Sequence, residues 1–396
     1  MPDLTQELTQ IPVGPLGIIA MPGCDELAKK VDEYIVSWRK EQNSEHKHSI
    51  AFYGYQKDSY ILDIDFHRFG TGEGKAVLHE SVRGYDIYIV IDVFNYGVTH
   101  SCYGLEVPTT PDEHFANLKR AIAACAGKAE RINVIMPMLY EGRQHKRSSR
   151  ESLDCALALQ ELCDLMGVDN IITFDAHDAR VQNAIPLKGF ENVTTTYQMI
   201  KALVKNIKDF KVDKDNLMII SPDEGGIQRC IYYSSVLGVE LGMFYKRRDY
   251  SVIVNGRNPI IAHEFLGDNV EGKDVIVVDD MISSGDSMLE VATKLKELKA
   301  KRIFICSAFG LFCNGLELFD KAYEEKVFDG VFTTNLVYQT EELKKREWYY
   351  SVDMSKYVAL LIDTLNNEKS LSELLSPGDR INAFLKRNGF NVVPRK

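Results

Sequence analysis

The sequence of 396 residues lacks any apolar run long enough to span a membrane. Its first residues, MPDLTQELTQ, have no basic start followed by an apolar stretch, so no secretory signal peptide is expected. An excess of positive charge is also lacking, because 47 Lys and Arg stand against 57 Asp and Glu and give a net charge of −10. This balance argues against broad electrostatic binding of nucleic acid and leaves only local basic clusters.

The eight cysteines include no CxxC pair, and most of them stand in apolar stretches, where a thiol behaves as a small hydrophobic side chain. This usage favours a reduced, cytosolic protein over a disulfide-bonded one. Hydrophobic residues make up 45% of the chain, which is enough for two domains that each have a core.

Apolar segments rich in β-branched residues alternate with amphipathic segments through most of the chain. We predict strands at 87–93, 132–138, 170–174, 217–220, 241–245, 275–278 and 302–308, and helices at 112–126, 151–166, 226–236 and 287–298. Nearly continuous apolar strands that alternate with helices predict parallel sheets covered on both faces. A domain boundary is expected near residues 190–210, and Asn95–Asp112 is interpreted as a long loop.

Polar residues end four of the predicted strands. Asp175 and His177 end IITFDAH, Asp223 ends MIISPDEGG, three cations end MFYKRR, and an acid pair ends VIVVDD. Open α/β sheets bind their ligands beyond the carboxyl ends of the strands. Four such endings together predict one charged cleft.

The segment VVDDMISSGDS carries the sharpest signal. Unpaired carboxylates are costly in a buried strand, so Asp279 and Asp280 are expected to bind something outside the sheet. The alternative is an ordinary loop in which Asp286 or Ser287 caps the next helix, but a cap does not explain the acid pair. In the functional interpretation the pair binds ribose hydroxyls or a divalent cation, and the turn Ser283–Ser287 binds a phosphate at a helix N-terminus.

Each of three further motifs has a purely structural and a functional interpretation. GTGEGKA at 70–76 is not a Walker loop, because its glycine spacing is one residue short and Ala76 replaces the Ser or Thr; we interpret it as a Gly-rich turn. GRQHKRSSR at 142–150 is either a solvated basic surface or a nucleotide-binding segment. YKRRDYS at 245–251 is either a hairpin turn or a cationic loop that closes over a site.

Seven motifs together resemble the ribose-phosphate pyrophosphokinase family, in its order and roughly its spacing. They are RFGTGEG, ESVRGYDIYIV, GRQHKRSSRE, ITFDAHDARVQ, SPDEGGIQR, FYKRR and VVDDMISSGDS, and the resemblance runs from about residue 15 to about residue 375. It implies two phosphoribosyltransferase-like domains, each a mainly parallel sheet flanked by helices. Residues 1–195 would hold the ATP motifs and 196–345 the phosphoribosyl-pyrophosphate (PRPP) and catalytic loops. Residues 346–396 would form a C-terminal helix and tail that pack back on the N-terminal domain.

The resemblance also implies an activity in nucleotide biosynthesis. The pyrophosphoryl group of ATP would pass, with Mg²⁺, to the anomeric hydroxyl of ribose 5-phosphate, giving PRPP and AMP. The implied protein is cytoplasmic, has no nucleic-acid or membrane partner, and forms a homo-oligomer of at least two subunits. The last point follows because the family's Gly-rich turn completes the adenine site of a neighbouring subunit.

Site residues carry over position by position. ATP would be bound by Phe69, Thr71, Gly72, Glu73, Arg143 and Gln144. The ribose phosphate would be bound by Arg248, Asp279, Asp280, Ser283, Ser284, Gly285, Asp286 and Ser287. Lys246 and Arg248 would be catalytic, and His177 and Asp223 would hold the metal. Histidine is an unusual Mg²⁺ ligand, so His177 could instead act on the ATP phosphates or through water.

Several positions depart from the family pattern. Thr71 replaces an aspartate that contacts adenine, His145 replaces an aspartate, and in the PRPP loop Ser283, Ser284 and Asp286 replace Asp, Thr and Gly. Three functions therefore stay open: the PRPP-forming enzyme, a different enzyme on the same scaffold, and a non-catalytic regulatory homologue. The second would be a pyrophosphokinase with another ribosyl acceptor or a phosphoribosyltransferase.

Overall fold

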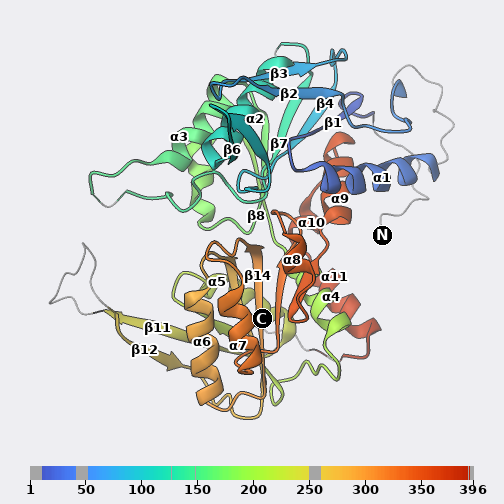
Figure 1. Cartoon of the computed structure of the whole chain (residues 1–396). Coiled ribbons are helices and arrows are strands. Elements are labelled where there is room, and N and C mark those ends of the chain that lie inside the picture. Colours follow the sequence, from blue (N-terminus) through green and yellow to red (C-terminus); the bar gives the residue numbers. More distant parts are fainter. Residues whose placement is uncertain are drawn as a thin grey trace. The chain divides into compact units, whose positions relative to one another are not determined.

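The computed structural model describes residues 11–41, 52–125, 127–147, 149–248, 260–390 and 392. The chain forms two compact units (Figure 1). Unit 1 consists of Met1–Thr194, Asn335–Tyr338 and Asp353–Leu375, and unit 2 consists of Thr195–Thr334, Gln339–Val352 and Ser376–Lys396. The chain thus leaves unit 1 at Thr194 and returns to it twice. Within the region 346–396, residues 353–375 group with unit 1 and the remainder groups with unit 2.

Unit 1 is built on a parallel five-stranded sheet in the order β1-β4-β7-β8-β9. Its strands are β1 (Leu16–Ala20), β4 (Asp86–Val90), β7 (Arg131–Ile135), β8 (Asn170–Phe174) and β9 (Gly189–Val193). Its helical segments are α1 (Asp25–Glu41), α2 (Pro111–Cys125), α3 (Asp154–Gln160), the π-helix η2 (Glu161–Leu165), the 3₁₀ helix η3 (Ala179–Ala184), α9 (Ser355–Asn366) and α10 (Ser372–Leu375). The interior strand β4, DIYIV, is buried along its whole length, as expected for a parallel sheet with both faces covered.

Two small antiparallel hairpins accompany this sheet. One is formed by β2 (Ile64–Arg68) and β3 (Gly74–Leu78), and the other by β5 (Thr99–Cys102) and β6 (Leu105–Pro108). The prediction of a long loop at Asn95–Asp112 is therefore wrong, because this segment contains the second hairpin and the start of α2. Tyr103 and Gly104 both adopt positive φ at its turn, which is the conformation that tight two-residue hairpin turns require.

A buried polar network joins α1 to the returning helix α9 in unit 1. These helices are far apart in the sequence and lie side by side (Figure 1). Arg39 of α1 is only 1% exposed, and it donates to Asp363 Oδ1 at 2.8 Å and to Asn366 Oδ1 at 2.7 Å. Asn366 also donates to the buried Asp86 Oδ2 at 2.9 Å, and Arg131 pairs with the same carboxylate at 2.8 Å. Every member of this network has a partner, which a buried charge requires.

Unit 2 is built on a seven-stranded sheet in the order β12-β11-β10-β13-β14-β15-β16. Its strands are β10 (Leu217–Ser221), β11 (Glu240–Arg248), β12 (Ile260–Leu266), β13 (Asp274–Ile282), β14 (Arg302–Gly310), β15 (Gly330–Thr334) and β16 (Tyr349–Val352). Its helices are α4 (Thr196–Asn206), α5 (Ile227–Leu237), α6 (Asp286–Glu297), α7 (Glu317–Glu324), α8 (Glu341–Lys344) and α11 (Gly378–Arg387). All neighbouring strands are parallel except β11 and β12.

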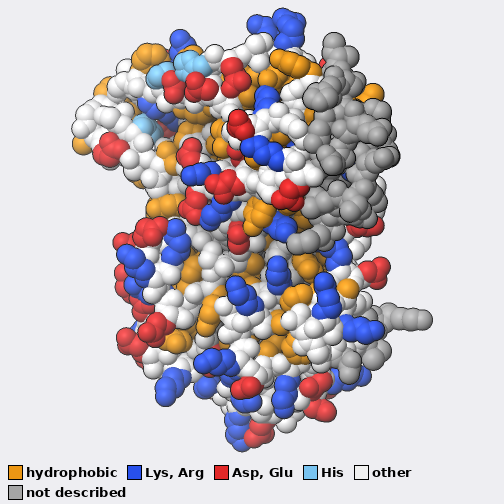
Figure 2. Space-filling view, turned by 90° about the vertical axis from the view of Figure 1, so that its right-hand side faces the viewer, with side chains coloured by type: hydrophobic (Ala, Val, Ile, Leu, Met, Phe, Trp, Pro, Cys, Tyr) orange, Lys and Arg blue, Asp and Glu red, His pale blue; other side chains and the backbone are white. Residues whose placement is uncertain are grey.

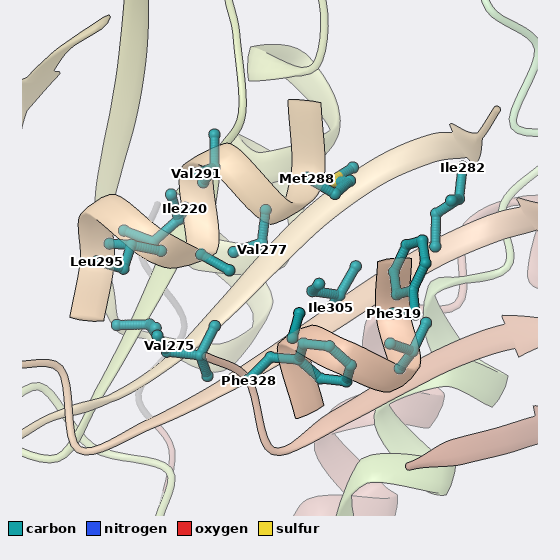
Figure 3. Packing of buried hydrophobic residues seen from close by; sticks show 14 of the residues in the cluster. Ile220, Val275, Val277, Ile282, Met288, Val291, Leu295, Ile305, Phe319 and Phe328 are labelled. Carbon is teal, nitrogen blue, oxygen red and sulfur yellow. The ribbon is translucent and has the colours of Figure 1, made fainter. Parts of the chain in front are cut away.

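Side chains of the central strands of unit 2 alternate between two apolar clusters. Val275, Val277 and Ile305 pack under α6 and α7, where Figure 3 shows them among Val291, Leu295, Phe319 and Phe328. Their strand neighbours, including Ile276 and Val278, pack on the opposite face against residues of α4, α5 and α11. The predicted parallel sheets flanked by helices are thus confirmed.

Charged side chains of both signs are interspersed on the face shown in Figure 2. Within the described residues, no helix is both long and apolar enough to cross a membrane.

Candidate functional site

The acid pair lies inside strand β13 and not after its end. The predicted strand stopped at Val278, but pairing with β14 continues, and Asp279 lies opposite Ser307. The neighbour on the other side, β10, pairs with β13 only as far as Val277. The two carboxylates therefore lie just past the end of β10, at the carboxyl edge where parallel sheets bind ligands. Asp280 is only 4% exposed, and Asp279 is partly exposed.

Burial and the adjacent carboxylate both disfavour ionisation of Asp279. Burial raises the pKa of Asp279 well above its usual value, and the charge of Asp280 raises it further. Arg229 opposes this shift, because its Nη1 lies 3.6 Å from Asp279 Oδ1. Asp279 Oδ1 also accepts from the backbone N–H of Asp280 at 2.9 Å, which fixes its side chain. The pair is thus held in place and poorly solvated, ready to bind hydroxyls or a cation.

No role of Arg229 was predicted from the sequence, although the motif SPDEGGIQR contains it. It lies in the first turn of α5, three residues after the N-cap Gly226. One turn of helix then separates it from the glycines that close the β10–α5 loop. This position after a Gly-Gly turn was the only available signal, because its partner Asp279 is 50 residues away in the sequence.

Asp223 lies near the acid pair. Its Oδ1 accepts from the N–H groups of Gly225 at 2.9 Å and Gly226 at 3.3 Å, and Ser221 Oγ donates to its carbonyl at 2.7 Å. A Cβ placed on Gly226 would lie 3.6 Å from Asp279 Oδ1 and 3.1 Å from Ser221 Oγ. Gly226 thus lies beside β13, and Asp223 and Asp279 flank the same residue.

The turn after β13 leads directly into α6. Gly285 is its N-cap with a φ of 94°, and a Cβ there would lie 2.2 Å from the ring of Phe319, so both conformation and space require glycine. The alternative in which Asp286 or Ser287 caps the helix is wrong, because the cap is Gly285 and makes no side-chain cap bond. Asp286 and Ser287 are both exposed in the first turn of α6. The N-terminus of α6 thus opens at the edge that holds the acid pair, which suits an anion.

Ser283 and Ser284 are partly exposed in the same turn. The carbonyl of Ser283 accepts from the N–H of Cys313 at 2.9 Å, which ties the turn to the segment after β14. The predicted phosphate-binding residues 283–287 therefore form one continuous segment, made of the turn after β13 and the start of α6.

Lys246 and Arg248 lie at the end of β11, two strands away from β13 in the same sheet. The backbone of Lys246 pairs with His263 and that of Arg248 with Ile260, with a bulge between Arg247 and Arg248. Their side chains lie outside the described residues, as does the loop that follows. Strand β11 therefore continues past the predicted end at residue 245 and includes Lys246, Arg247 and Arg248.

In unit 1 the Gly-rich segment is the turn of the β2–β3 hairpin, as its sequence predicted. Phe69 N–H donates to Glu73 O and Gly72 N–H to Phe69 O, both at 2.8 Å, and Thr71 Oγ1 donates to Glu73 Oε2 at 2.9 Å. A Walker loop joins a strand to a helix, and this turn joins two antiparallel strands. Phe69 is 54% exposed, so its ring is available for stacking on a planar ligand.

The basic segment follows β7 and precedes α3. Arg143 and Gln144 are exposed, and Gln144 Nε2 donates to Glu141 Oε2 at 2.8 Å. Glu141 has a φ of 54°, a conformation rare for residues with side chains and common near functional sites.

His177 lies exposed on the loop that follows β8, close to the basic segment. Its ring centroid is 5.3 Å from that of His145, and His145 Nε2 is 3.4 Å from Asp178 Oδ2. This histidine pair was not predicted from the sequence, because 32 positions separate the two residues. Burial lowers the pKa of His145, and the charge of Asp178 opposes that shift.

The structure thus gathers the candidates into local groups. Unit 2 brings Asp223, Asp279, Asp280 and Arg229 together beside the turn 283–287. Unit 1 brings the basic segment beside His177. Among the described residues, no three His, Cys, Asp or Glu side chains form a ready-made metal cage.

Comparison with known proteins agrees with this architecture. Residues 16–165 match the N-terminal domain of ribose phosphate pyrophosphokinase, and residues 190–337 match the phosphoribosyl transferase domain. A solved phosphoribosylpyrophosphate synthetase from Mycobacterium smegmatis has a TM-score of 0.69 at 22% identity, and the likeness covers 89% of this chain and 99% of that one. The fold is therefore of the phosphoribosyltransferase type.

Relatives in the curated set make the assignment more specific. The chain is 26% identical to a ribose-phosphate pyrophosphokinase of Mycoplasmopsis pulmonis, over 77% of this chain and 86% of the relative. It is 27% identical to one of Vibrio cholerae, over 79% and 91%. The chain belongs to the ribose-phosphate pyrophosphokinase family.

Proposed function

We propose that this protein transfers the pyrophosphoryl group of Mg-ATP to the anomeric hydroxyl of ribose 5-phosphate, forming PRPP and AMP. The observation that carries the proposal is in unit 2. An acid pair, held by Arg229, is followed within a few residues by a turn that opens a helix N-terminus. A ribose phosphate needs this combination, namely acceptors for its hydroxyls and donors for its phosphate. The names of the relatives support the same reaction.

The sugar would be oriented by its two polar ends. Asp279 and Asp280 would accept hydrogen bonds from the vicinal ribose hydroxyls. The turn Ser283–Ser287 would bind the 5-phosphate through hydroxyls and N–H groups at the start of α6. Asp286 brings a negative charge to this turn, but its side chain is exposed at the helix surface and need not face the phosphate.

ATP would be bound chiefly by unit 1. The exposed ring of Phe69 would stack on the adenine bound at a neighbouring subunit, and Thr71, Gly72 and Glu73 would offer polar contacts to that adenine from the same turn. Arg143, Gln144 and His177 would contact the nucleotide from the basic segment and the loop after β8.

The metal would arrive with the triphosphate. Mg²⁺ in nucleotide sites is usually held by one or two carboxylates together with phosphates and water, so the absence of a ready-made cage among the described residues fits this mode. Asp223 and Asp279, which flank Gly226, are suitable oxygen donors. When bound, the ion neutralises charge on the phosphate oxygens.

The chemical step is an in-line displacement. The anomeric oxygen forms a bond to the β-phosphorus, the bond from that phosphorus to the α,β-bridging oxygen breaks, and AMP leaves with the bridging oxygen. The proton of the anomeric hydroxyl is released. Lys246 and Arg248 would stabilise negative charge on the transferring group, since this reaction depends mainly on positioning and electrostatic stabilisation.

The protein would act in the cytoplasm as a homo-oligomer, with a dimer as the smallest active form. Light scattering at assay concentration tests the second point, and a fully active monomer would contradict it.

The direct test incubates the protein with Mg-ATP and ribose 5-phosphate and measures AMP and PRPP. We expect both products in equal amounts. A parallel reaction with 2-deoxyribose 5-phosphate removes one hydroxyl of the diol and should be much slower if the acid pair binds that diol. Consumption of PRPP by a nucleobase, without PRPP formation from ATP, would instead indicate a phosphoribosyltransferase. No reaction in either assay would favour the non-catalytic homologue.

A further inference from the structure

The hairpin β5–β6 packs against the Gly-rich turn of the hairpin β2–β3. The backbone N–H of Tyr103, at the tip of β5–β6, donates to the carbonyl of Gly70 at 2.7 Å. The residue before it lies equally close, since a Cβ placed on Gly72 would be 3.2 Å from Cys102 Sγ. The tip of one hairpin is therefore in direct contact with the turn that carries Phe69.

One carboxylate of α2 contacts side chains of both hairpins. Glu113 Oε1 lies 3.6 Å from Arg68 Nη1, at the end of β2, and 3.2 Å from His100 Nε2 of β5. Arg68 Nη1 also donates to the carbonyl of Gly72 at 2.6 Å. Because the hairpins share this carboxylate and are joined at their tips by a backbone hydrogen bond, we expect them to behave as one rigid element.

The backbone of Tyr103 has an unfavourable conformation for a bulky residue. Tyr103 is the first residue of a two-residue hairpin turn and has a φ of 48°, and Gly104 follows with a φ of 78°. Asn or Asp is preferred at this first position because both tolerate positive φ, and a tyrosine there costs free energy. Tyr103 is 79% exposed, so packing in the core does not offset that cost. A strained and exposed tyrosine of this kind indicates a role outside the fold.

Phe69 and Tyr103 thus place two exposed aromatic side chains on adjoining turns. We propose that Tyr103 is a further nucleobase-binding residue, which contacts the adenine bound at the neighbouring subunit beside Phe69. This inference rests on the proposed function, in which the turn Phe69–Glu73 contacts that adenine. A tyrosine is suited to this role, because its ring stacks on a base and its hydroxyl forms hydrogen bonds with a base edge.

The first experiment measures the Kd of Mg-ATP by calorimetry for the full-length protein and for three variants. Tyr103→Asn removes the ring and places a residue that favours the turn, so the hairpin is retained. Tyr103→Phe keeps the ring. Tyr53→Asn is the matched control, because Tyr53 is a tyrosine of unit 1 that is 78% exposed and lies outside both hairpins. Inorganic tripolyphosphate with Mg²⁺ is the probe that lacks a base.

We expect Tyr103→Asn to weaken Mg-ATP binding about fivefold or more, because a contact between an aromatic ring and a base is lost. Binding of tripolyphosphate should not change, and Tm should stay equal or rise because the strain at positive φ is relieved. Tyr103→Phe should keep most of the ATP affinity. Unchanged ATP affinity in Tyr103→Asn, an equal loss for tripolyphosphate, or an equal loss in Tyr53→Asn would overturn the proposal. Dissociation of Tyr103→Asn into monomers would indicate a contact between protein surfaces and would also overturn it.

A second experiment tests which subunit the contact serves. Copies with Tyr103→Asn are co-expressed with copies that carry Arg143→Ala, a change in the basic segment that would bind the nucleotide of its own subunit. In a two-fold dimer, a mixed pair has one site that combines the intact hairpins of one copy with the intact basic segment of the other. Random pairing should therefore give wild-type ATP affinity to about a quarter of all sites. A mixture without such sites would show that Tyr103 acts within its own subunit and would overturn the proposal.

Failure of the proposed function gives a different result. Wild-type protein that binds Mg-ATP but makes no PRPP would contradict that function and leave both binding tests of Tyr103 intact.

Discussion

The two units hold their candidate residues by different means. In unit 2 the carboxylates of Asp279 and Asp280 belong to a strand in the middle of the sheet, and the adjoining turn is fixed by Gly285 against Phe319. In unit 1 the Gly-rich turn belongs to a separate two-stranded hairpin, and side-chain bonds from Arg68 and Glu113 link it to α2.

From this difference we infer which unit controls the chemical step and which controls nucleotide binding. A site fixed by the sheet core has little freedom, which suits groups that must be aligned within fractions of an ångström of the reacting atoms. A turn held by side-chain bonds adjusts more readily and suits recognition of the nucleotide. We therefore expect substitutions in unit 2 to change kcat and those in unit 1 to change ATP affinity.

The largest effect is expected for Lys246→Ala. Its place at the end of β11 in the unit 2 sheet predicts a fall in kcat of about 10²- to 10³-fold, since it would act on charge in the transition state. Apparent ATP affinity should change little. Steady-state kinetics against Lys294→Ala, a surface lysine of α6 paired with Glu297, separates this effect from a general loss of charge. Intact kcat with weakened ATP binding would reverse the assignment of roles.

Asp279→Asn is expected to lower kcat by less than Lys246→Ala does. The same change is expected to increase the thermal stability of the protein. Activity should fall at least tenfold, equivalent to about 1.4 kcal/mol of transition-state stabilisation. The folded protein raises the pKa of Asp279 mainly by burial, so this group favours folding less and less as pH rises from about 4 through the raised value. Asparagine removes that penalty, and Tm near neutral pH should increase.

The measurement is a pair of Tm profiles from pH 4 to pH 9, with the exposed Asp268→Asn as the control. The advantage of Asp279→Asn should grow with pH and vanish near pH 4. An equal or lower Tm across the whole range, with full activity retained, would show that the acid pair is neither strained nor functional.

The smallest effect is expected in unit 1, for Thr71→Val. This change removes the hydrogen bond from Thr71 Oγ1 to Glu73 Oε2, and one such bond contributes about 0.5 to 1.5 kcal/mol. ATP affinity should weaken about two- to tenfold, with kcat nearly unchanged. Titration with ATP and with GTP shows whether the same bond affects nucleotide selectivity. A change in kcat larger than the change in Kd would remove the distinction between the units.

Periodicity predicted the features that local sequence determines. Strand β8 has the predicted bounds, Asn170–Phe174, because its buried apolar run is framed by polar residues. The hairpin β5–β6 was missed because THSC and LEVP are strands of only four residues each and are largely exposed. The acid pair stood out because charge within a buried strand is costly.

Residues that depend on distant partners could not be predicted in this way. Glu113 looks like an ordinary helix-surface residue until the hairpins fold beside it, and Arg229 gains a role only through Asp279. The resemblance supplied the roles of single residues such as Lys246, which no periodic pattern indicates.

The buried Arg39 has a consequence for how the protein is made. Its partners Asp363 and Asn366 come 324 and 327 positions later in the chain, after all seven strands of unit 2. During synthesis on the ribosome, Arg39 is therefore made long before Asp363 and Asn366 and cannot yet be buried together with them. Leaving one partner of a buried ion pair alone costs about 3 to 5 kcal/mol. A chain that ends before residue 363 would therefore lack both of these partners of Arg39, and we expect its unit 1 to be less stable.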